Sequence, residues 1–176
     1  MSSTDRLSVG VIGTGWVGSS VAISTLHLGV ANELLLFDAK PNLAEGEAMD
    51  LAHGSSFYPS AEVRAVALEE MLETDVVVMC AGRGGRPEES RLDLLKENAR
   101  ITTSVAEVFK SYSGIVVVVA NPVDVLTQVF QESSGLAPER VMGTGTMLDT
   151  SRLREVIGRR LDLSPRSIHA HVVGEH

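Results

Sequence analysis

The sequence contains a glycine-rich turn near its N-terminus, of the kind that binds phosphate groups. Residues 13–18 read GTGWVG, a G-x-G-x-x-G pattern that follows an apolar run and opens a segment with helical spacing. Free N–H groups at the start of such a helix, and the positive end of its dipole, favour a pyrophosphate. Asp38 follows Gly18 by twenty residues, at the end of the second apolar run. Its carboxylate can accept hydrogen bonds from ribose hydroxyls and would repel a 2′-phosphate, so the pattern predicts an NAD site.

Further glycine and polar residues follow the later apolar runs. The fourth run ends in Ala81 and Gly82, ahead of the charged segment RGGRPEESR, and the fifth ends in the segment ANPVD. A doubly wound sheet gathers its ligands at the carboxyl ends of its strands, so these segments are predicted to meet at one site. The predicted cofactor-binding residues are Gly13, Gly15, Trp16, Val17, Gly18, Asp38, Ala81, Gly82, Ala120, Asn121 and Thr144.

Alternating strand and helix patterns predict the elements that position these residues. Short apolar runs predict strands at residues 7–12, 33–37, 62–66, 75–80, 115–120 and 140–142. Segments with helical spacing separate most of them, which indicates an α/β fold with a doubly wound parallel sheet, a Rossmann NAD-binding fold. A later helix at about 148–161 and a strand at 169–173 suggest the start of a second, α+β substrate domain. We therefore expect a dinucleotide-binding domain at 1–145 and the beginning of a truncated catalytic domain at 146–176.

The charge balance and composition exclude several classes of partner. Fifteen basic and 23 acidic residues give a net charge of −8, which argues against nucleic acid and anionic membranes. No apolar run is long enough to span a bilayer, and the first residues do not resemble a signal peptide. The single cysteine, Cys80, fits a reducing cytoplasm, and no cluster of residues has metal-ligand spacing.

Four motifs in a fixed order make the chain similar to the L-lactate/malate dehydrogenase family. They are GTGWVG, the AG…SR loop, NPVD, and LDTSR followed by GEH, and the resemblance covers essentially the whole chain, with bacterial lactate-type members the most alike. The resemblance implies hydride transfer between NAD and a small 2-hydroxy acid, with L-lactate/pyruvate favoured over the alternatives. It also implies a homo-oligomer, either a dimer or a tetramer.

The resemblance assigns a role to each matching residue. His176 corresponds to the catalytic proton donor and acceptor, and Asp149 to the carboxylate that holds its imidazole. Arg152 corresponds to the arginine that binds the substrate carboxylate, which a planar guanidinium can grip through two hydrogen bonds. Arg91 corresponds to the mobile-loop arginine that polarises the substrate carbonyl, and Asn121 to a contact with substrate and cofactor beside a bend that is often cis-proline. Taken singly, these residues also fit surface salt bridges or a helix cap.

The specificity position departs from the family pattern. Six residues before the loop arginine, lactate-type members usually carry glutamine and malate-type members arginine, but this chain has Gly85. Glycine offers no charge for a second carboxylate, which favours lactate and leaves room for larger 2-oxo acids. Arg86 or Arg83 could restore malate recognition, so a malate dehydrogenase and a broader 2-oxo acid reductase stay open as alternatives.

Two expectations concern regulation and completeness. Arg154 and His169 match positions at which allosteric lactate-type members bind fructose 1,6-bisphosphate. The chain stops at His176, whereas family members continue, so a non-catalytic NAD-binding fragment is the alternative from another class. We expect such a fragment to be inactive on its own.

Overall fold

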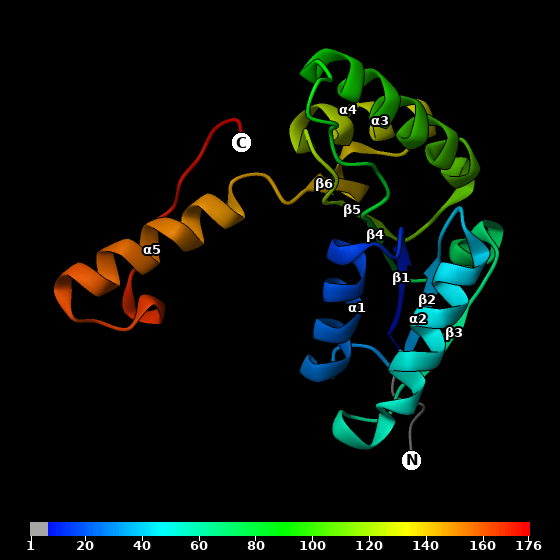
Figure 1. The fold of residues 1–176 in the computed structure, drawn as a ribbon, viewed down its shortest axis with the longest axis horizontal. Helices are drawn as coiled ribbons and strands as arrows, with labels where there is room; N and C mark the ends of the chain where they lie inside the picture. The colour runs from blue at the N-terminus through cyan, green and yellow to red at the C-terminus, as the bar shows by residue number, and fades with distance from the viewer. Residues whose placement is uncertain (1–6) are drawn as a thin grey trace.

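A computed structural model describes residues 7–176 as a parallel sheet covered by helices, with one helix standing apart (Figure 1). The sheet has six strands in the order β3-β2-β1-β4-β5-β6, all paired in parallel. This order confirms the predicted doubly wound α/β fold, and the strand bounds lie within two residues of the predicted ones. The strands are β1 (Ser8–Ile12), β2 (Glu33–Phe37), β3 (Glu62–Ala65), β4 (Val76–Met79), β5 (Ile115–Val118) and β6 (Val141–Gly143).

Four α-helices and several short 3₁₀ turns connect the strands, and a fifth α-helix follows the last strand. The α-helices are α1 (Trp16–Leu28), α2 (Pro41–His53), α3 (Arg91–Ala106), α4 (Val123–Ser134) and α5 (Met147–Leu161). The 3₁₀ turns are η1 (Ser55–Phe57), η2 (Leu68–Glu73), η3 (Val108–Ser111), η4 (Pro138–Arg140) and η5 (Pro165–Ser167).

The central strands are almost entirely apolar because both faces of the sheet are covered, whereas the edge strand β3 carries the exposed residues Glu62 and Arg64. Successive strand residues point to opposite faces, and accordingly Leu35 packs in one core while Leu34 and Leu36 pack in the other. One core is formed with α3, α4 and η3, and the second with α1 and α2. The carboxyl ends of β1, β2, β4 and β5 therefore meet along one edge, where the predicted polar residues follow.

Helix α5 extends away from the sheet, and the residues after it run back along the helix (Figure 1). The predicted strand at 169–173 is wrong: this segment is extended but pairs with no strand in the described part of the chain. Its backbone is satisfied instead by side chains of α5 and its N-cap. The carbonyl of Val172 accepts from the Thr146 hydroxyl at 2.7 Å, and its N–H donates to the Thr150 hydroxyl at 3.1 Å.

Candidate functional site

The glycine turn between β1 and α1 is shaped by close backbone contacts. Gly13 has a φ of +91°, which favours glycine, and its N–H donates to the carbonyl of Phe37 at 2.7 Å. A Cβ on Gly18 would lie 1.8 Å from the Gly13 carbonyl oxygen, so no side chain fits there. A Cβ on Gly15 would meet nothing within 4 Å. The turn is thus packed tightly on the sheet side and open on the side where a pyrophosphate would approach.

Asp38 is fixed beside this turn by two backbone N–H groups. The N–H of Thr14 donates to Oδ2 at 2.9 Å, and the N–H of Lys40 donates to Oδ1 at 2.9 Å. Oδ2 also accepts from the Thr14 hydroxyl at 3.3 Å, so Oδ1, which accepts one hydrogen bond, is the oxygen left to accept from a ribose hydroxyl. The carboxylate is therefore oriented in advance at the edge where β2 ends.

A groove of about 640 Å³ runs along the glycine turn and the ends of β2 and β4. Many of the predicted cofactor residues line it, namely Gly13, Gly15, Trp16, Val17, Gly18, Asp38, Ala81 and Gly82. Ala120, Asn121 and Thr144 are not among its lining residues and lie at the ends of β5 and β6. A dinucleotide fits this donor set, because the open side of Gly15 and the N-terminus of α1 face the groove together with the Asp38 carboxylate.

The sequence prediction missed the apolar wall of the groove. Leu43 of α2 and Ile101 and Val105 of α3 line it. The two α3 residues are four apart and share a helix face, which is the signal that could have found them. They add an apolar surface that suits the flat face of a nucleobase.

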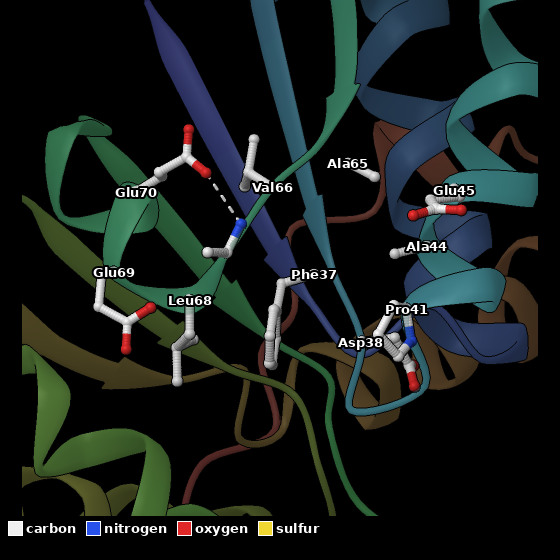
Figure 2. A pocket seen from close by; sticks show the side chains of 11 residues that line it. Phe37, Asp38, Pro41, Ala44, Glu45, Ala65, Val66, Leu68, Glu69 and Glu70 are labelled. Carbon is white, nitrogen blue, oxygen red and sulfur yellow. Dashed lines mark hydrogen bonds between the residues drawn. The ribbon is translucent and has the colours of Figure 1, made fainter.

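A second pocket of about 650 Å³ shares Asp38 with the groove and lies between α2, η2 and the end of β3 (Figure 2). Its lining includes the carboxylates of Glu45, Glu69 and Glu70, and Glu70 accepts a hydrogen bond from the Ala67 N–H at 3.0 Å. No residue of the glycine turn lines this pocket, and its negative charge opposes a pyrophosphate. The first groove is therefore the candidate dinucleotide site.

The structure brings His176 and Asp149 together from distant parts of the chain. Nδ1 of His176 lies 2.5 Å from Oδ2 of Asp149, and the backbone N–H of His176 donates to Asp124 Oδ2 at 2.8 Å. Asp149 belongs to the first turn of α5 and Asp124 to the first turn of α4. The hydrogen bond from His176 is the main cause that lowers the pKa of Asp149 below its ordinary value. The imidazole is thus held through Nδ1, and its Nε2 is the nitrogen left for a substrate.

Arg152 lies one helical turn from Asp149, and its guanidinium is 3.4 Å from Asp149 Oδ1. Arg91, at the first position of α3, is exposed, and in residues 7–176 no hydrogen bond or ion pair joins it to Arg152 or His176. Asn121 is exposed after β5, and the bond between Asn121 and Pro122 is cis. Direct contacts therefore join His176, Asp149 and Arg152, and in residues 7–176 Arg91 forms no bond with this group.

The charged loop between β4 and α3 is tied to itself and to α3. The Arg83 guanidinium donates to both carboxylate oxygens of Glu89, and its NH1 atom lies 2.7 Å from Glu89 Oε2. It also donates to the carboxylate of Glu97 in α3. This guanidinium lowers the pKa of Glu89 from 4.5 to about 2. Gly85 and Arg86 are exposed in the same loop. Of the two arginines considered for malate recognition, Arg83 is therefore already paired with carboxylates.

Asn98, which the motifs do not include, is buried within α3 and forms hydrogen bonds with the loop after β4 and with the loop after β5. Its side chain accepts from the Arg83 N–H at 2.9 Å and donates to the carbonyls of Arg83 (3.2 Å) and Asn121 (3.1 Å). Asn98 is a polar residue on the face of α3 where the other positions are mostly apolar, and this departure is the sequence signal that could have identified it.

The predicted regulatory residues lie near each other without direct contact. Nε of Arg154 donates to the carbonyl of Ala170 at 2.9 Å, and its NH2 lies 3.3 Å from Nε2 of His171. His169 is exposed one residue before Ala170. The imidazole that meets the Arg154 guanidinium is thus that of His171.

Burial raises the pKa of the Cys80 thiol to about 12, so this thiol is not a nucleophile at neutral pH. Among residues 7–176, no group of three or more His, Cys, Asp or Glu side chains is arranged to hold a metal ion. No helix in this range is both long and apolar enough to cross a bilayer.

Known proteins match this chain over almost its whole length. An L-lactate dehydrogenase from Kosmotoga olearia is 46% identical over 173 residues, which cover 97% of this chain and 54% of that relative. L-lactate dehydrogenase 2 from Lactococcus lactis is 46% identical over 179 residues, covering 100% and 57%. This chain thus spans about half the length of these relatives.

Solved structures match the fold closely. The minor L-lactate dehydrogenase from Enterococcus mundtii in its ligands-bound form superimposes with a TM-score of 0.95 at 41% identity, covering 98% of this chain and 56% of that one. The apo malate dehydrogenase from Picrophilus torridus gives a TM-score of 0.90 at 35% identity, covering 97% and 55%. Residues 7–143 match the family model described as lactate/malate dehydrogenase, NAD binding domain. The chain therefore belongs to the lactate/malate dehydrogenase family, and residues 7–143 are its NAD-binding domain.

Proposed function

We propose that the protein containing this chain interconverts L-lactate and pyruvate with NAD, and that His176 exchanges the proton. The observation that carries the proposal is the pair formed by His176 Nδ1 and Asp149 Oδ2, 2.5 Å apart. A carboxylate at Nδ1 favours the tautomer whose Nε2 accepts a proton. His176 then takes the hydroxyl proton in oxidation and returns it in reduction, while Asp149 stabilises the cationic imidazolium. The bound nicotinamide supplies the chemistry of hydride transfer.

Arg152 is proposed to bind the substrate carboxylate. Its guanidinium is solvent-exposed and lies one turn from Asp149, on the same side of α5 as the histidine pair. The contact with Asp149 is long, at 3.4 Å, so a bidentate pair with a substrate carboxylate can replace it. Arg91 joins the site only when the loop between β4 and α3 moves toward α5, and its role in polarising the carbonyl rests on that closure.

Pyruvate is the proposed substrate because the loop supplies little free positive charge. Oxaloacetate carries a second carboxylate, which needs a cation, and Gly85 offers none. The Arg83 guanidinium is paired with Glu89 and Glu97. Malate dehydrogenase remains the second candidate, because Arg86 is exposed in the same loop and a malate dehydrogenase is among the matching structures.

The test uses the full-length protein that contains these residues. Values of kcat/KM for pyruvate, oxaloacetate and 2-oxoisocaproate with NADH are compared, and we expect pyruvate to be preferred. A clear preference for oxaloacetate would refute the lactate assignment and favour Arg86 as the specificity residue.

The alternative of a non-catalytic NAD-binding fragment is tested on the 176-residue polypeptide itself. Trp16 is the single tryptophan and is 95% exposed beside the groove, so its fluorescence reports cofactor binding. We expect NAD to change this fluorescence while pyruvate turnover is absent, because the chain spans only about half of its relatives. Turnover by this polypeptide would contradict that expectation.

We also propose that residue 146 begins the substrate domain and that the protein is a homo-oligomer located in the cytoplasm. Helix α5 extends away from the sheet (Figure 1). Met49 of α2 and Phe57 of η1 are apolar side chains that are 60% and 82% exposed, which fits a further protein surface there. Light scattering of the full-length protein measures the oligomeric state.

Regulation by fructose 1,6-bisphosphate stays a prediction. It is supported by the guanidinium of Arg154, which lies beside the segment that carries His169 and His171. A pyruvate saturation curve of the full-length protein that is unchanged by the sugar bisphosphate would remove this prediction.

A further inference from the structure

Asn98 is a buried polar side chain at the place where two loops of the site meet. It lies within α3 and only 3% of its surface is exposed. A buried amide must be hydrogen-bonded to avoid a large desolvation penalty, so its partners reveal what it holds in place. None of these partners belongs to α3 itself.

All three hydrogen bonds of this amide go to the backbone of the loops after β4 and β5. Oδ1 accepts from the Arg83 N–H at 2.9 Å, and Nδ2 donates to the Arg83 carbonyl at 3.2 Å and to the Asn121 carbonyl at 3.1 Å. The amide orientation follows from these partners, because an N–H group faces its oxygen and two carbonyls face its nitrogen. Both amide hydrogens and the oxygen are thereby used.

The two bonded positions belong to the proposed site. Gly82, next to Arg83, lines the dinucleotide groove, and a Cβ there would lie 3.5 Å from Asn98 Oδ1 and 3.6 Å from Ala120 Cβ. Asn121 is the proposed contact for substrate and cofactor. Asn98 therefore sets the spacing between the ends of β4 and β5, at one edge of the sheet.

Asn98 also connects these loops to the proposed mobile arginine. Arg91 begins α3 seven residues before Asn98, which is two helical turns or about 10 Å along the axis. Residue 97, adjacent to Asn98, pairs with the Arg83 side chain. The base of the loop is thus fixed to the middle of α3, about two turns after the helix begins at Arg91.

We propose that Asn98 is a positioning residue for the reaction, which aligns the loops that carry Gly82 and Asn121 with the helix that carries Arg91. The inference rests on the proposed dehydrogenase function. It adds a residue that touches neither substrate nor cofactor and acts through the backbone of those that do.

The test compares Asn98→Asp with the wild-type full-length protein. Aspartate keeps an acceptor for the Arg83 N–H but cannot donate, and its charge faces the carbonyls of Arg83 and Asn121. We expect kcat/KM for pyruvate to fall about tenfold to a hundredfold. Binding of ADP-ribose, which lacks the nicotinamide, should stay within about threefold, because in the described residues neither the glycine turn nor Asp38 is hydrogen-bonded to Asn98.

Thr102→Val is the matched control on the same face of α3. Thr102 is fully buried, and its hydroxyl has no hydrogen-bond partner among the described residues. This near-isosteric change alters the packing of the helix without touching either loop, so kcat and KM should stay within about twofold. Asn98→Ser, which retains a hydroxyl too short to reach all three partners, replaces Asn98→Asp if the latter does not fold.

Three results would overturn the proposal. The first is a folded Asn98 variant that has a lower melting temperature but the wild-type kcat and KM. The second is a reduction of turnover by Thr102→Val that is as large as that by the Asn98 variant. The third is a loss of ADP-ribose binding in the Asn98 variant that parallels its loss of turnover. A wild-type protein that does not reduce pyruvate refutes the proposed function instead, and this outcome is read before any variant is compared.

Discussion

Nδ1 of His176 lies 2.5 Å from Oδ2 of Asp149, although the two residues are 27 positions apart in the chain. The contact exists because the segment after α5 runs back along that helix, where Thr146 and Thr150 bond to the backbone of Val172. The main chain of His176 is held separately by Asp124 of α4. Ring and backbone are thus fixed from two different helices, which defines the direction of Nε2.

Asp149→Asn in the full-length protein should lower kcat by about a hundredfold to ten-thousandfold, the range that general acid–base catalysis supplies. An amide cannot stabilise the imidazolium, and its NH₂ group can bind Nδ1 in the wrong tautomer. Steady-state kinetics with pyruvate and NADH measure the effect. Asp124→Asn is the matched control and should change kcat much less, because in residues 7–176 the Asp124 side chain accepts only from the backbone N–H of His176. Wild-type turnover in the Asp149 variant would contradict the proton-transfer role of this pair.

Asp38→Asn should weaken NAD binding and reduce the preference over NADP. The substitution removes the charge that repels a 2′-phosphate, while one amide oxygen remains to accept from the Thr14 or Lys40 N–H. Trp16 fluorescence titrations with both cofactors give the ratio of dissociation constants, which should shift toward NADP by about tenfold. Glu45→Gln, in the neighbouring acidic pocket, should leave this ratio unchanged. An equal shift in both variants would show that general surface charge, and not Asp38, sets the preference.

Strand positions were predictable because buried parallel strands are apolar on both faces, and the order of the motifs indicated the family. The buried face of α1 is harder to predict from the sequence. Helical spacing of the larger residues predicts a face formed by Val17, Val21, Thr25 and Leu28. The structure buries Gly18, Ala22, Thr25 and Leu26, with Val21 only partly buried against the same core. Small residues face the sheet there because α1 packs closely against it. Hydrophobicity alone therefore predicts a face that is rotated around the helix from the buried one.

The segment at 169–173 and Asn98 illustrate what local patterns omit. An alternating apolar run indicates a strand only if a neighbouring strand is available, and here side chains of α5 replace it. The role of Asn98 depends on two carbonyls and one N–H supplied by loops 15 and 23 residues away. Such partners are set by the tertiary fold, so a single sequence cannot identify them by spacing.

Glu89 should titrate near pH 2 in the folded protein, below its ordinary value near 4.5, because the Arg83 guanidinium favours its charged form. A folded-state pKa that is lowered means that the pair stabilises the loop fully above pH 4.5, and that this stabilisation declines as the pH falls toward about 2. The chemical shift of the Glu89 carboxyl carbon measures the midpoint. In Arg83→Met, the midpoint should return toward 4.5. If it stays near that of the wild type, the Arg83 pair is not the cause of the shift.

Gly85→Arg should increase the use of oxaloacetate relative to pyruvate, since it adds the cation that a second carboxylate requires. A Cβ at residue 85 would lie 3.2 Å from Cδ2 of Leu94, the flexible end of a half-buried side chain, so a small shift accommodates it. A charge-assisted hydrogen-bond pair contributes about 1.5–3 kcal/mol, which corresponds to a change in the kcat/KM ratio of about tenfold to a hundredfold. Gly84→Arg is the control, because a Cβ there meets nothing within 4 Å and the same charge is placed one residue away. If both variants change the kcat/KM ratio equally, the loop acts only through its overall positive electrostatic field, and specificity does not depend on position 85.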